Sequence, residues 1–482
     1  MEQTKITRER VFAGVVWKFA ERIGAQGVGL IVSIALARLL SPEAYGTIAL
    51  IQIFITILSV FVSSGFGSAL MQKQKADDLD YSSVFYFQIL FSVFLYVILF
   101  VASPLIAKFY ENQELTSVLR VLGISLIING INNVQHAYVS KTLQFKRFFF
   151  STLVGTVTSG IVGIIMAYKG FGVWALVAQQ LINAIMDVTI LWFTVKWRPI
   201  LAFSIKRLKY LFAFGWKLLI SSLIDVLYTN LYGLLIGKIY DSNALGLYNK
   251  GRQFPNLIIS NINGPIQSVL LPTIATEQDN KERVKSMVRR SIVTSSFIIF
   301  PVMIGMAAIS KPIIIILLTD KWSACIPIMQ ISCITMALLP IHTANLQAIT
   351  AMGRSDVFLK LEIIKKILGI TVLIGSIPFG LYGMVWGGAL VSVITTFINA
   401  YPNKKLLDYS GIEQWKDIMP SLVLSLVMGS MVLAIELLKW NIYITIVIQC
   451  IVGIVAYLGM AKIFKFECYQ YLIEILRKRK KK

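Results

Sequence analysis

The sequence predicts an all-α integral membrane protein with about fourteen transmembrane helices. Composition is the first reason: 56% of the residues are hydrophobic and 15% are charged, whereas soluble proteins carry roughly 25% charged residues. The second reason is that the apolar residues come in successive runs of about 20, the length that crosses a bilayer. The third is that the polar connections between these runs are too short to fold as separate domains.

The spans follow one another closely along the chain. Ser41 is placed to cap the second helix, with Pro42 at its first position and Glu43 near its positive end. Prolines 255, 265 and 272 fall within the eighth span, so we expect that helix to be bent or broken. The predicted spans are residues 11–40, 43–69, 82–109, 116–140, 148–168, 172–195, 208–237, 244–274, 286–309, 325–351, 357–378, 381–401, 417–438 and 441–463.

The basic residues lie mostly in alternate connections. QKQK, KTLQFKR, KERVKSMVRR and the terminal RKRKKK fall on one side of the membrane if the spans alternate, and the other side has only scattered cations. Because Lys and Arg are enriched in cytoplasmic loops, both termini are predicted to be cytoplasmic. The net charge of +22 therefore reflects membrane topology. We expect no nucleic-acid partner, and the four cysteines show no metal-ligand spacing.

The first half of the sequence recurs in the second half at an offset of about 200 residues. ARLLSPEAYG matches GKIYDSNALG, Trp17-Lys18 matches Trp216-Lys217, and two later matches keep the same order. Parallel repeats are typical of transporters, in which the substrate path lies between the halves. We predict a first lobe over residues 1–200, a second lobe over 201–405, two appended helices over 406–465 and a basic cytoplasmic tail over 466–482.

Polar side chains form stripes at helical spacing inside three of the spans. The first span carries Lys18, Arg22 and Gln26, and the seventh carries Lys217, Ser221 and Asp225. The stripe of the eighth span consists of Asn249, Gln253, Asn256, Ser260 and Asn263, with Lys250 and Arg252 beside its start. A charge at the centre of a bilayer costs at least about 2.5–3.5 kcal/mol, so these faces are expected to meet a protein interior or a water-filled cavity.

Cations outnumber carboxylates in these stripes, which predicts an electropositive cavity that attracts an anion. Arg and Lys suit phosphate in particular, so we expect a phosphate-bearing cargo rather than a cationic drug. The predicted cationic binding residues are Lys18, Arg22, Lys217, Lys250 and Arg252. The predicted polar lining consists of Gln26, Asn249, Gln253, Asn256, Ser260 and Asn263.

The acidic residues of the spans have two interpretations. Glu21, Asp187 and Asp225 either pair with nearby cations or couple transport to a proton or sodium gradient. His136 is either a hydrogen-bonded interior histidine or part of a proton relay. No cofactor or catalytic residue is expected.

Several stretches together resemble the Wzx-type flippases of polysaccharide repeat units, within the superfamily of multidrug and oligosaccharidyl-lipid exporters. They are ALARLLSPEAYGTIAL, GFGSALMQKQ, FYENQEL followed by VLRVLGISLII and LQFKR, GFGVWALVAQQL, KWRP, and LLIGKIYDSNALGLYNKGRQFPNL. They cover most of residues 1 to about 330, and the remainder is compatible.

The resemblance implies two six-helix lobes like those of multidrug exporters and lipid II flippases, plus two further helices. It implies alternating access that moves an undecaprenyl-pyrophosphate-linked oligosaccharide across the bacterial inner membrane, for lipopolysaccharide O-antigen, capsule or exopolysaccharide synthesis. Related lipid II flippases bind pyrophosphate with basic residues of the first and eighth helices, to which Arg22 and Arg252 are the most similar positions. Membrane lipids, a polysaccharide polymerase and a chain-length regulator are the implied partners. The two last helices are implied to border a groove for the polyprenyl tail.

Two other functions stay open at this point. A cation-coupled multidrug antiporter of the same superfamily would favour an acidic or aromatic cavity, whereas these stripes carry more cations. A polyprenyl-dependent membrane glycosyltransferase, polymerase or ligase would need catalytic carboxylates or a long loop outside the bilayer. The sequence shows neither, so we expect a protein that is not an enzyme.

Overall fold

The computed structural model describes residues 8–63, 65–73, 76–470 and 473–474, and every regular element among them is a helix. This confirms the predicted all-α fold class. The described chain forms two compact units, Met1–Gly246 (unit 1) and Leu247–Lys482 (unit 2). These units are defined by packing, so the lobe boundaries predicted from the repeat stay a prediction. Most of the predicted basic tail lies outside the described residues.

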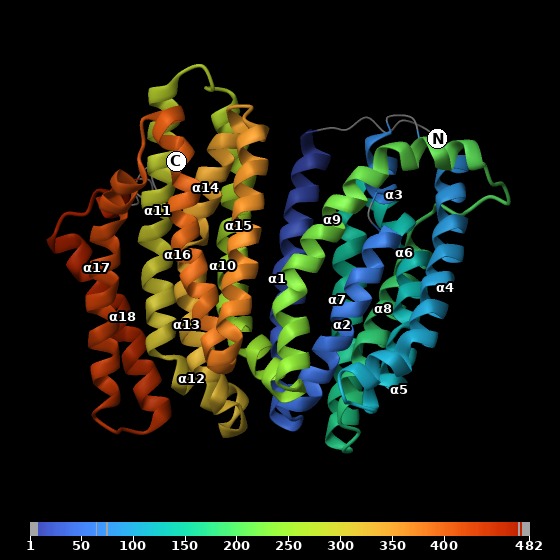
Figure 1. Ribbon diagram of the computed structural model, residues 1–482, viewed down its shortest axis with the longest axis horizontal. Helices are drawn as coiled ribbons and strands as arrows, with labels where there is room; N and C mark the ends of the chain where they lie inside the picture. Colours follow the sequence, from blue (N-terminus) through green and yellow to red (C-terminus); the bar gives the residue numbers. More distant parts are fainter. Residues whose placement is uncertain (1–7, 64, 74–75, 471–472, 475–482) are drawn as a thin grey trace. The chain divides into compact units, whose positions relative to one another are not determined.

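Unit 1 contains nine helices and the first turn of a tenth among its described residues (Figure 1). They are α1 (Arg8–Leu39), α2 (Pro42–Ser63), α3 (Phe66–Gln72), α4 (Asp78–Phe109), α5 (Glu114–Leu122), α6 (Ile124–Lys141), α7 (Phe145–Tyr168), α8 (Val173–Thr194), α9 (Ile205–Ile239) and the start of α10 (Ser242–Ala275).

Unit 2 contains the rest of α10 and the helices that follow it. They are α11 (Lys281–Ala308), α12 (Ser310–Leu318), η1 (Asp320–Cys325), α13 (Ile326–Ala337), α14 (Leu339–Ala351), α15 (Ser355–Ser376), η2 (Ile377–Phe379), α16 (Gly380–Leu407), α17 (Gly411–Glu436) and α18 (Ile442–Ile463).

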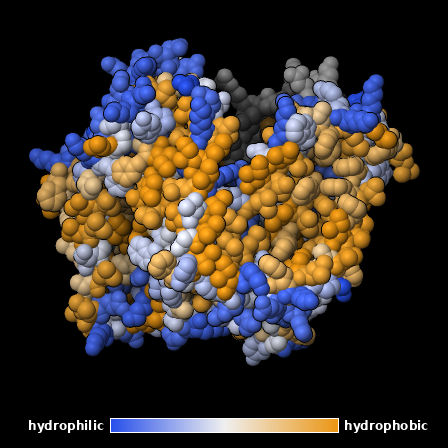
Figure 2. All heavy atoms as spheres, viewed as in Figure 1, coloured by the Kyte–Doolittle hydropathy of each residue, from blue (hydrophilic) through white to orange (hydrophobic). Residues whose placement is uncertain are grey.

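The chain is a multi-pass membrane protein. Among the described residues, 12 helical segments are long and apolar enough to cross a bilayer. The other two predicted spans correspond to α15 and α16, and the first twelve residues of α15 include five charged side chains. In each unit, hydrophobic side chains occupy the middle of the visible face and hydrophilic ones gather towards its two ends (Figure 2).

The details of three spans differ from the sequence prediction. The predicted spans 43–69, 116–140 and 325–351 are each built from two consecutive helices. By contrast, α10 is a single continuous helix, although Pro255, Pro265 and Pro272 lie inside it. Of the two expectations, a break is therefore wrong, and a bend stays a prediction. Each proline removes one backbone donor, and neighbouring helices in a membrane bundle commonly accommodate that loss.

The helix boundaries around residues 40 and 240 follow the repeat. Helix α1 ends at Leu39 and α9 at Ile239, while α2 begins at Pro42 and α10 at Ser242. The caps match as well. The amide of Ala44 donates to Ser41 Oγ at 3.3 Å, and the amide of Ala244 donates to Asp241 Oδ1 at 2.6 Å. The Ser41 cap predicted from the sequence is thus present.

Two glycines related by the repeat lie against each other in unit 1. A Cβ on Gly46 would be 1.5 Å from the carbonyl oxygen of Ser242, and a Cβ on Gly246 would be 1.9 Å from that of Pro42. The contact is reciprocal, because positions 42 and 242 are also related by the repeat. Only glycine allows the two helix starts to approach so closely.

The helices with the predicted stripes are loosely covered within unit 1. Helix α1 packs along α7, and α9 packs against α2, α3 and α4. Only 12% of the apolar window of α1 and 11% of that of α9 are buried, the lowest shares among the candidate spans. Each helix therefore presents most of its circumference to its surroundings.

We predict that replacing Gly46 with Val destabilises unit 1 by at least about 3 kcal/mol, because the new side chain meets backbone that cannot move aside cheaply. The measurement is the free energy of unfolding of the purified protein in detergent, together with its level in the membrane. Gly459→Ala is the matched control, because a Cβ at Gly459 meets nothing within 4 Å. Equal stability of the two variants would contradict the contact described here.

Candidate functional site

The polar stripe of α1 lies on an exposed face near the middle of the helix. Lys18 and Arg22 are exposed, and Gln26 is half-buried. Lys18 Nζ lies 2.8 Å from Glu21 Oε2 and 5.1 Å from the centroid of the Phe148 ring. The ion pair that the sequence left open for Glu21 is therefore present, and it neutralises Lys18 locally.

The corresponding stripe of α9 is also exposed at Lys217, Ser221 and Asp225. Within the described part of the chain, Lys217 forms no ion pair, and its ammonium lies 6.0 Å from the ring of Trp216. A charged side chain on an exposed helix face inside the bilayer is tolerated where water reaches it. The exposure of these residues therefore favours a wet environment for this face of α9.

The predicted residues of α10 differ from one another in burial. Asn249 and Asn256 are exposed, while Gln253 and Ser260 are half-buried. Asn263 is buried, and its Oδ1 has no hydrogen-bond partner among the described residues. The stripe thus passes from the surface into the interior of unit 2.

The two cations of α10 are held by their neighbours. Lys250 is only 4% exposed, donates to Gln253 Oε1 at 3.0 Å and lies 5.8 Å from the ring of Trp322. Arg252 is half-buried, with its guanidinium over the ring of Tyr248 and hydrogen-bonded to the Tyr248 hydroxyl. Lys250 is therefore a buried residue of unit 2, and the binding role predicted for both cations stays a prediction.

Asp187 lies where α6, α7 and α8 meet. Its Oδ2 accepts hydrogen bonds from Asn132 Nδ2 at 2.6 Å and from the His136 ring at 2.9 Å. The sequence left open whether Asp187 pairs with nearby cations or takes part in ion coupling, and these two contacts do not decide between them. The structure also shows the hydrogen-bonded state of His136.

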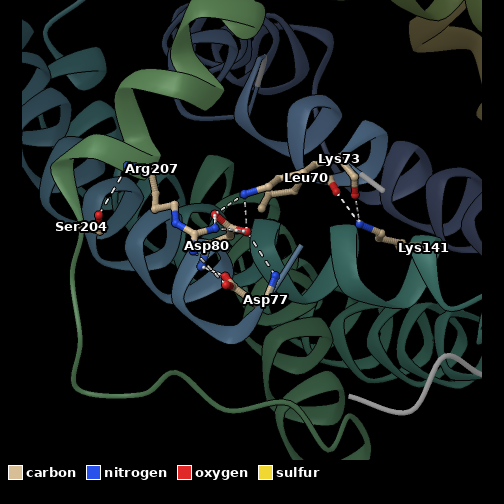
Figure 3. A network of polar contacts seen from close by, with 7 residues as sticks. All are labelled: Leu70, Lys73, Asp77, Asp80, Lys141, Ser204 and Arg207. Carbon is tan, nitrogen blue, oxygen red and sulfur yellow. Dashed lines mark hydrogen bonds and ion pairs between the residues drawn. The ribbon is translucent and has the colours of Figure 1, made fainter. Parts of the chain in front are cut away.

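The sequence analysis missed a charged network at one end of unit 1, which Figure 3 shows from close by. The Asp80 carboxylate is fully buried and pairs with Lys73 at 2.6 Å and with Arg207 at 3.2 Å. Arg207 also reaches Asp77, at 3.1 Å. The network joins the end of α3, the start of α4 and the start of α9. The signal for it was Asp77-x-x-Asp80, which forms a capping box at the start of α4.

A fourth helix joins this network through its last residue. Lys141 Nζ donates to the carbonyl oxygens of Leu70 and Lys73 at the end of α3, at 2.9 and 2.5 Å (Figure 3). Unpaired carbonyls at a helix end attract cations, so this contact fixes α3 against α6.

The Asp77 carboxyl responds to the same charges. Partial burial works to raise its pKa, but hydrogen bonds from Asp80 and the charges of Arg207 and Lys73 outweigh this effect, so the pKa of Asp77 lies below its usual value. A carboxyl with a lowered pKa stabilises the fold above its unfolded-state pKa of about 4. That contribution is lost as the pH falls through the folded-state value.

Unit 2 contains an apolar cavity of about 520 Å³. Residues of α10, α11, α12, α17 and α18 line it, among them Phe297, Pro301, Val302, Met428 and Ile454. Val302 and Ile454 are exposed, so the cavity has an apolar rim at the surface of the unit. The appended helices predicted from the sequence, α17 and α18, form one wall.

Residues 35–327 match the family model described as "Polysaccharide biosynthesis protein". The chain belongs to this family. The match covers more than half of the 482 residues, and it confirms the resemblance drawn from the sequence motifs.

The similar curated proteins have names from polysaccharide synthesis. The chain is 25% identical over 381 residues to the teichuronic acid biosynthesis protein TuaB of Bacillus subtilis, covering 78% of this chain and 79% of that protein. It is 22% identical over 433 residues to the lipopolysaccharide biosynthesis protein WzxC of Escherichia coli, covering 88% of each. The succinoglycan biosynthesis transport protein ExoT of Rhizobium meliloti is 20% identical over 362 residues, covering 75% of this chain and 73% of that protein.

Solved structures establish the fold. The lipid II flippase MurJ in its inward closed conformation has a TM-score of 0.74 at 17% identity, covering 96% of this chain and all of that one. An inward-facing MATE-family multidrug transporter has a TM-score of 0.61 at 16% identity, covering 82% of this chain and 98% of that one. The fold is therefore that of the exporter superfamily to which both structures belong.

We predict that the polar faces of α1 and α9 are reached by water. In a variant whose 4 native cysteines are replaced by Ser, Arg22→Cys and Lys217→Cys should react with a membrane-impermeant thiol reagent. Val447→Cys on α18 is the control, because Val447 is 55% exposed on an apolar face expected to meet lipid. Labelling as slow at positions 22 and 217 as at 447 would show that the two polar faces are dry.

We predict that Asp80→Asn lowers the free energy of unfolding by roughly 3 kcal/mol, because two cations lose their buried partner. The value lies at the low end for a broken buried pair, since Arg207 is 37% exposed and can reach water. Unfolding at pH 7 of the purified variant measures it. Asp78→Asn, an exposed carboxylate two positions away, is the control. A loss no greater than that of the control would contradict a stabilising network.

Proposed function

We propose that this protein flips a polyprenyl-pyrophosphate-linked oligosaccharide across the bacterial cytoplasmic membrane for the synthesis of a surface polysaccharide. The observation that carries the proposal is the family match over residues 35–327 on a chain with exposed cations in two of its spans. Membership of the family points to polysaccharide synthesis. The cations can bind an anionic headgroup inside the bilayer.

The comparisons favour this function over its alternatives. The names of TuaB, WzxC and ExoT refer to three different polysaccharides, and that of ExoT includes transport. The MATE transporter shares the fold, so the fold alone does not decide between a lipid-linked glycan and a drug. The polysaccharide family match favours the glycan over the drug. The name of ExoT and the shared fold of a flippase and a transporter favour transport over glycosyl transfer or polymerisation.

The pyrophosphate is proposed to contact Arg22 of α1 and Lys217 of α9. Arg22 offers the paired donors that suit phosphate oxygens, and Lys217 adds a cation without a carboxylate partner among the described residues. Gln26, Asn249 and Asn256 are suited to bind sugar hydroxyls. Lys18 contributes less charge because Glu21 neutralises it. Arg252 keeps the role implied by its position on the eighth span.

The apolar cavity of unit 2 is proposed to hold part of the polyprenyl chain. Its wall of Phe297, Val302, Met428 and Ile454 offers no charge to a hydrocarbon tail. An exposed apolar rim would let the tail enter sideways from the lipid. Helices α17 and α18 line this cavity, in agreement with the groove that the sequence resemblance implied for the two last helices.

The proposed orientation has both termini in the cytoplasm. The support is the excess of Lys and Arg in alternate connections, which include Lys73, Lys141 and Arg207 at one end of unit 1. A change of conformation would expose the site to each side of the membrane in turn. No cofactor is proposed. A polymerase and a chain-length regulator are proposed partners in the same pathway.

The decisive experiment deletes the gene and identifies the accumulated lipid-linked intermediates by mass spectrometry. We expect loss of surface polysaccharide and accumulation of a polyprenyl-pyrophosphate-linked oligosaccharide. Complementation with Arg22→Ala or Lys217→Ala should restore export roughly 10- to 100-fold less efficiently than the wild type, as expected for loss of a charged hydrogen bond to the cargo. Arg22→Lys should restore more than Arg22→Ala.

Lys169→Ala is the matched control, because Lys169 is an exposed cation in the connection between α7 and α8. All variants must be present in the membrane at the wild-type level. A deletion strain with intact surface polysaccharide and increased drug sensitivity would instead support the antiporter.

A further inference from the structure

Three helices of unit 1 build a polar site around Asp187 of α8. Helix α6 supplies Asn132 and His136, which are one turn apart and both bond to Asp187 Oδ2. Helix α7 supplies Ser151, which is fully buried and whose hydroxyl donates to the Phe148 carbonyl oxygen at 3.2 Å. The site lies within the spans, where a carboxylate is costly unless it has a function or is fully neutralised.

The polar atoms of this site are incompletely satisfied. Asp187 Oδ1 is buried and has no hydrogen-bond partner among the described residues. Asn132 is 6% exposed, and its Oδ1 also lacks a partner there. Asp187 Oδ1 and Asn132 Oδ1 can therefore accept a further donor or a positive species.

The geometry favours a proton as that species. Oδ2 of Asp187 accepts from both neighbours, so His136 donates through Nε2 and its Nδ1 is left to accept a proton. Oδ1 of Asp187 is a second position for the same proton. A sodium ion would prefer several oxygen ligands, whereas the two groups bonded to Asp187 Oδ2 are both nitrogen donors, the His136 imidazole and the Asn132 amide.

Water can reach the pair without exposing all of it. The His136 side chain is 44% exposed and that of Asp187 is 22% exposed. The imidazole stacks on Phe148 with ring centroids 4.7 Å apart, and Lys18 Nζ lies 5.1 Å from the same ring centroid. The histidine is therefore within about 10 Å of a member of the predicted cationic set, close enough for its charge to be felt.

Few charged groups lie near His136 and Asp187. Lys18 and its partner Glu21 on α1 lie across Phe148. Helix α6 ends in Lys141, whose ammonium donates to the Leu70 carbonyl oxygen of α3. The other titratable groups on the elements packed against α6 and α8 are Glu43 and Tyr45 of α2, Lys73 at the end of α3, Asp78, Asp80, Tyr81, Tyr86, Tyr96 and Lys108 of α4, Glu114 and Arg120 of α5, Tyr138 of α6, and Lys146, Arg147 and Tyr168 of α7.

Several of those groups form ion pairs with other residues or lie at the opposite end of unit 1. Asp80 pairs with Lys73 and Arg207. The residues of α5 and the start of α2 belong to the opposite end of unit 1, where Glu43 lies near Glu111 and Asp241. The direct partners of the Asp187 carboxylate are thus His136 and Asn132.

We propose that His136 and Asp187 form a proton-binding site that is loaded and emptied during the transport cycle. A proton from water on one side adds to the pair, at His136 Nδ1 or Asp187 Oδ1, and returns to water when the conformation changes. No bond other than that to the proton forms or breaks. The coupling to transport rests on the proposed flippase function, whereas the binding of the proton does not.

The proton site is tested directly on the purified full-length protein in lipid nanodiscs. The chain has only 2 histidines, His136 and His342, so isotope-labelled histidine gives few NMR signals, and His136→Asn assigns them. We expect His136 to gain and lose a proton reversibly as the pH is varied, and sodium chloride at constant ionic strength to leave this behaviour unchanged. Asp187→Asn should move the midpoint by about one pH unit or more. Asp279→Asn, an exposed carboxylate, should not.

Three outcomes of this titration would overturn the site. They are a His136 signal that does not titrate, a midpoint that Asp187→Asn leaves unchanged, and a signal that follows sodium instead of pH. The last result would identify a sodium site.

The coupling is tested in cells carrying His136→Asn, Asp187→Asn or Asp187→Glu at wild-type membrane levels. We expect wild-type export to vary with external pH, and export by the two Asn variants to be at least tenfold slower or independent of pH. Asp187→Glu should restore part of the pH dependence. Normal, pH-dependent export by both Asn variants would refute the coupling even if His136 titrates. Normal export by Arg22→Ala and Lys217→Ala would instead refute the proposed headgroup site and leave the titration result standing.

Discussion

The cost of placing a charge in a hydrocarbon environment governs this molecule. Unit 1 answers that cost in three ways. It buries Asp80 completely but surrounds it with Lys73 and Arg207. It leaves Lys217 on an exposed face, which is tolerable only if water reaches it. It half-buries Asp187 with partners that satisfy one carboxylate oxygen and not the other. The first arrangement serves stability, the second suits an anionic cargo, and the third suits a proton.

Packing by small residues complements these electrostatic arrangements. Gly46 and Gly246 let two helix starts touch through their backbones, and Gly65 and Gly215 do the same between α3 and α9. Small residues are a general means of bringing membrane helices together, because apolar side chains gain little from leaving lipid. Helix α9 is thus held at Gly215 against the start of α3, while the nearby side chain of Lys217 stays exposed. Such an arrangement fixes the position of the cation without burying it.

The sequence analysis succeeded where a one-dimensional pattern has one physical meaning. Runs of about 20 apolar residues have to be membrane helices, and all predicted spans correspond to helices. The Ser41 cap followed from Ser-Pro-Glu, and the structure adds a matching cap at Asp241. It did not decide between a bend and a break at the prolines of α10, because whether a missing hydrogen bond breaks a helix depends on the packing around it.

By itself, the sequence determined the helical membrane fold, the repeat, the family and the stripes of charge, since each is a property of residues close together along the chain or of their order. Only the tertiary structure decided the use of each charge. Lys250 and Lys217 look alike in the sequence, yet one is buried against Trp322 and the other is exposed. Asp80 and Asp187 likewise differ only in which distant residues meet them. The reason is that the energy of a charge depends on its solvent and its partners, which are set by contacts between residues far apart in the chain.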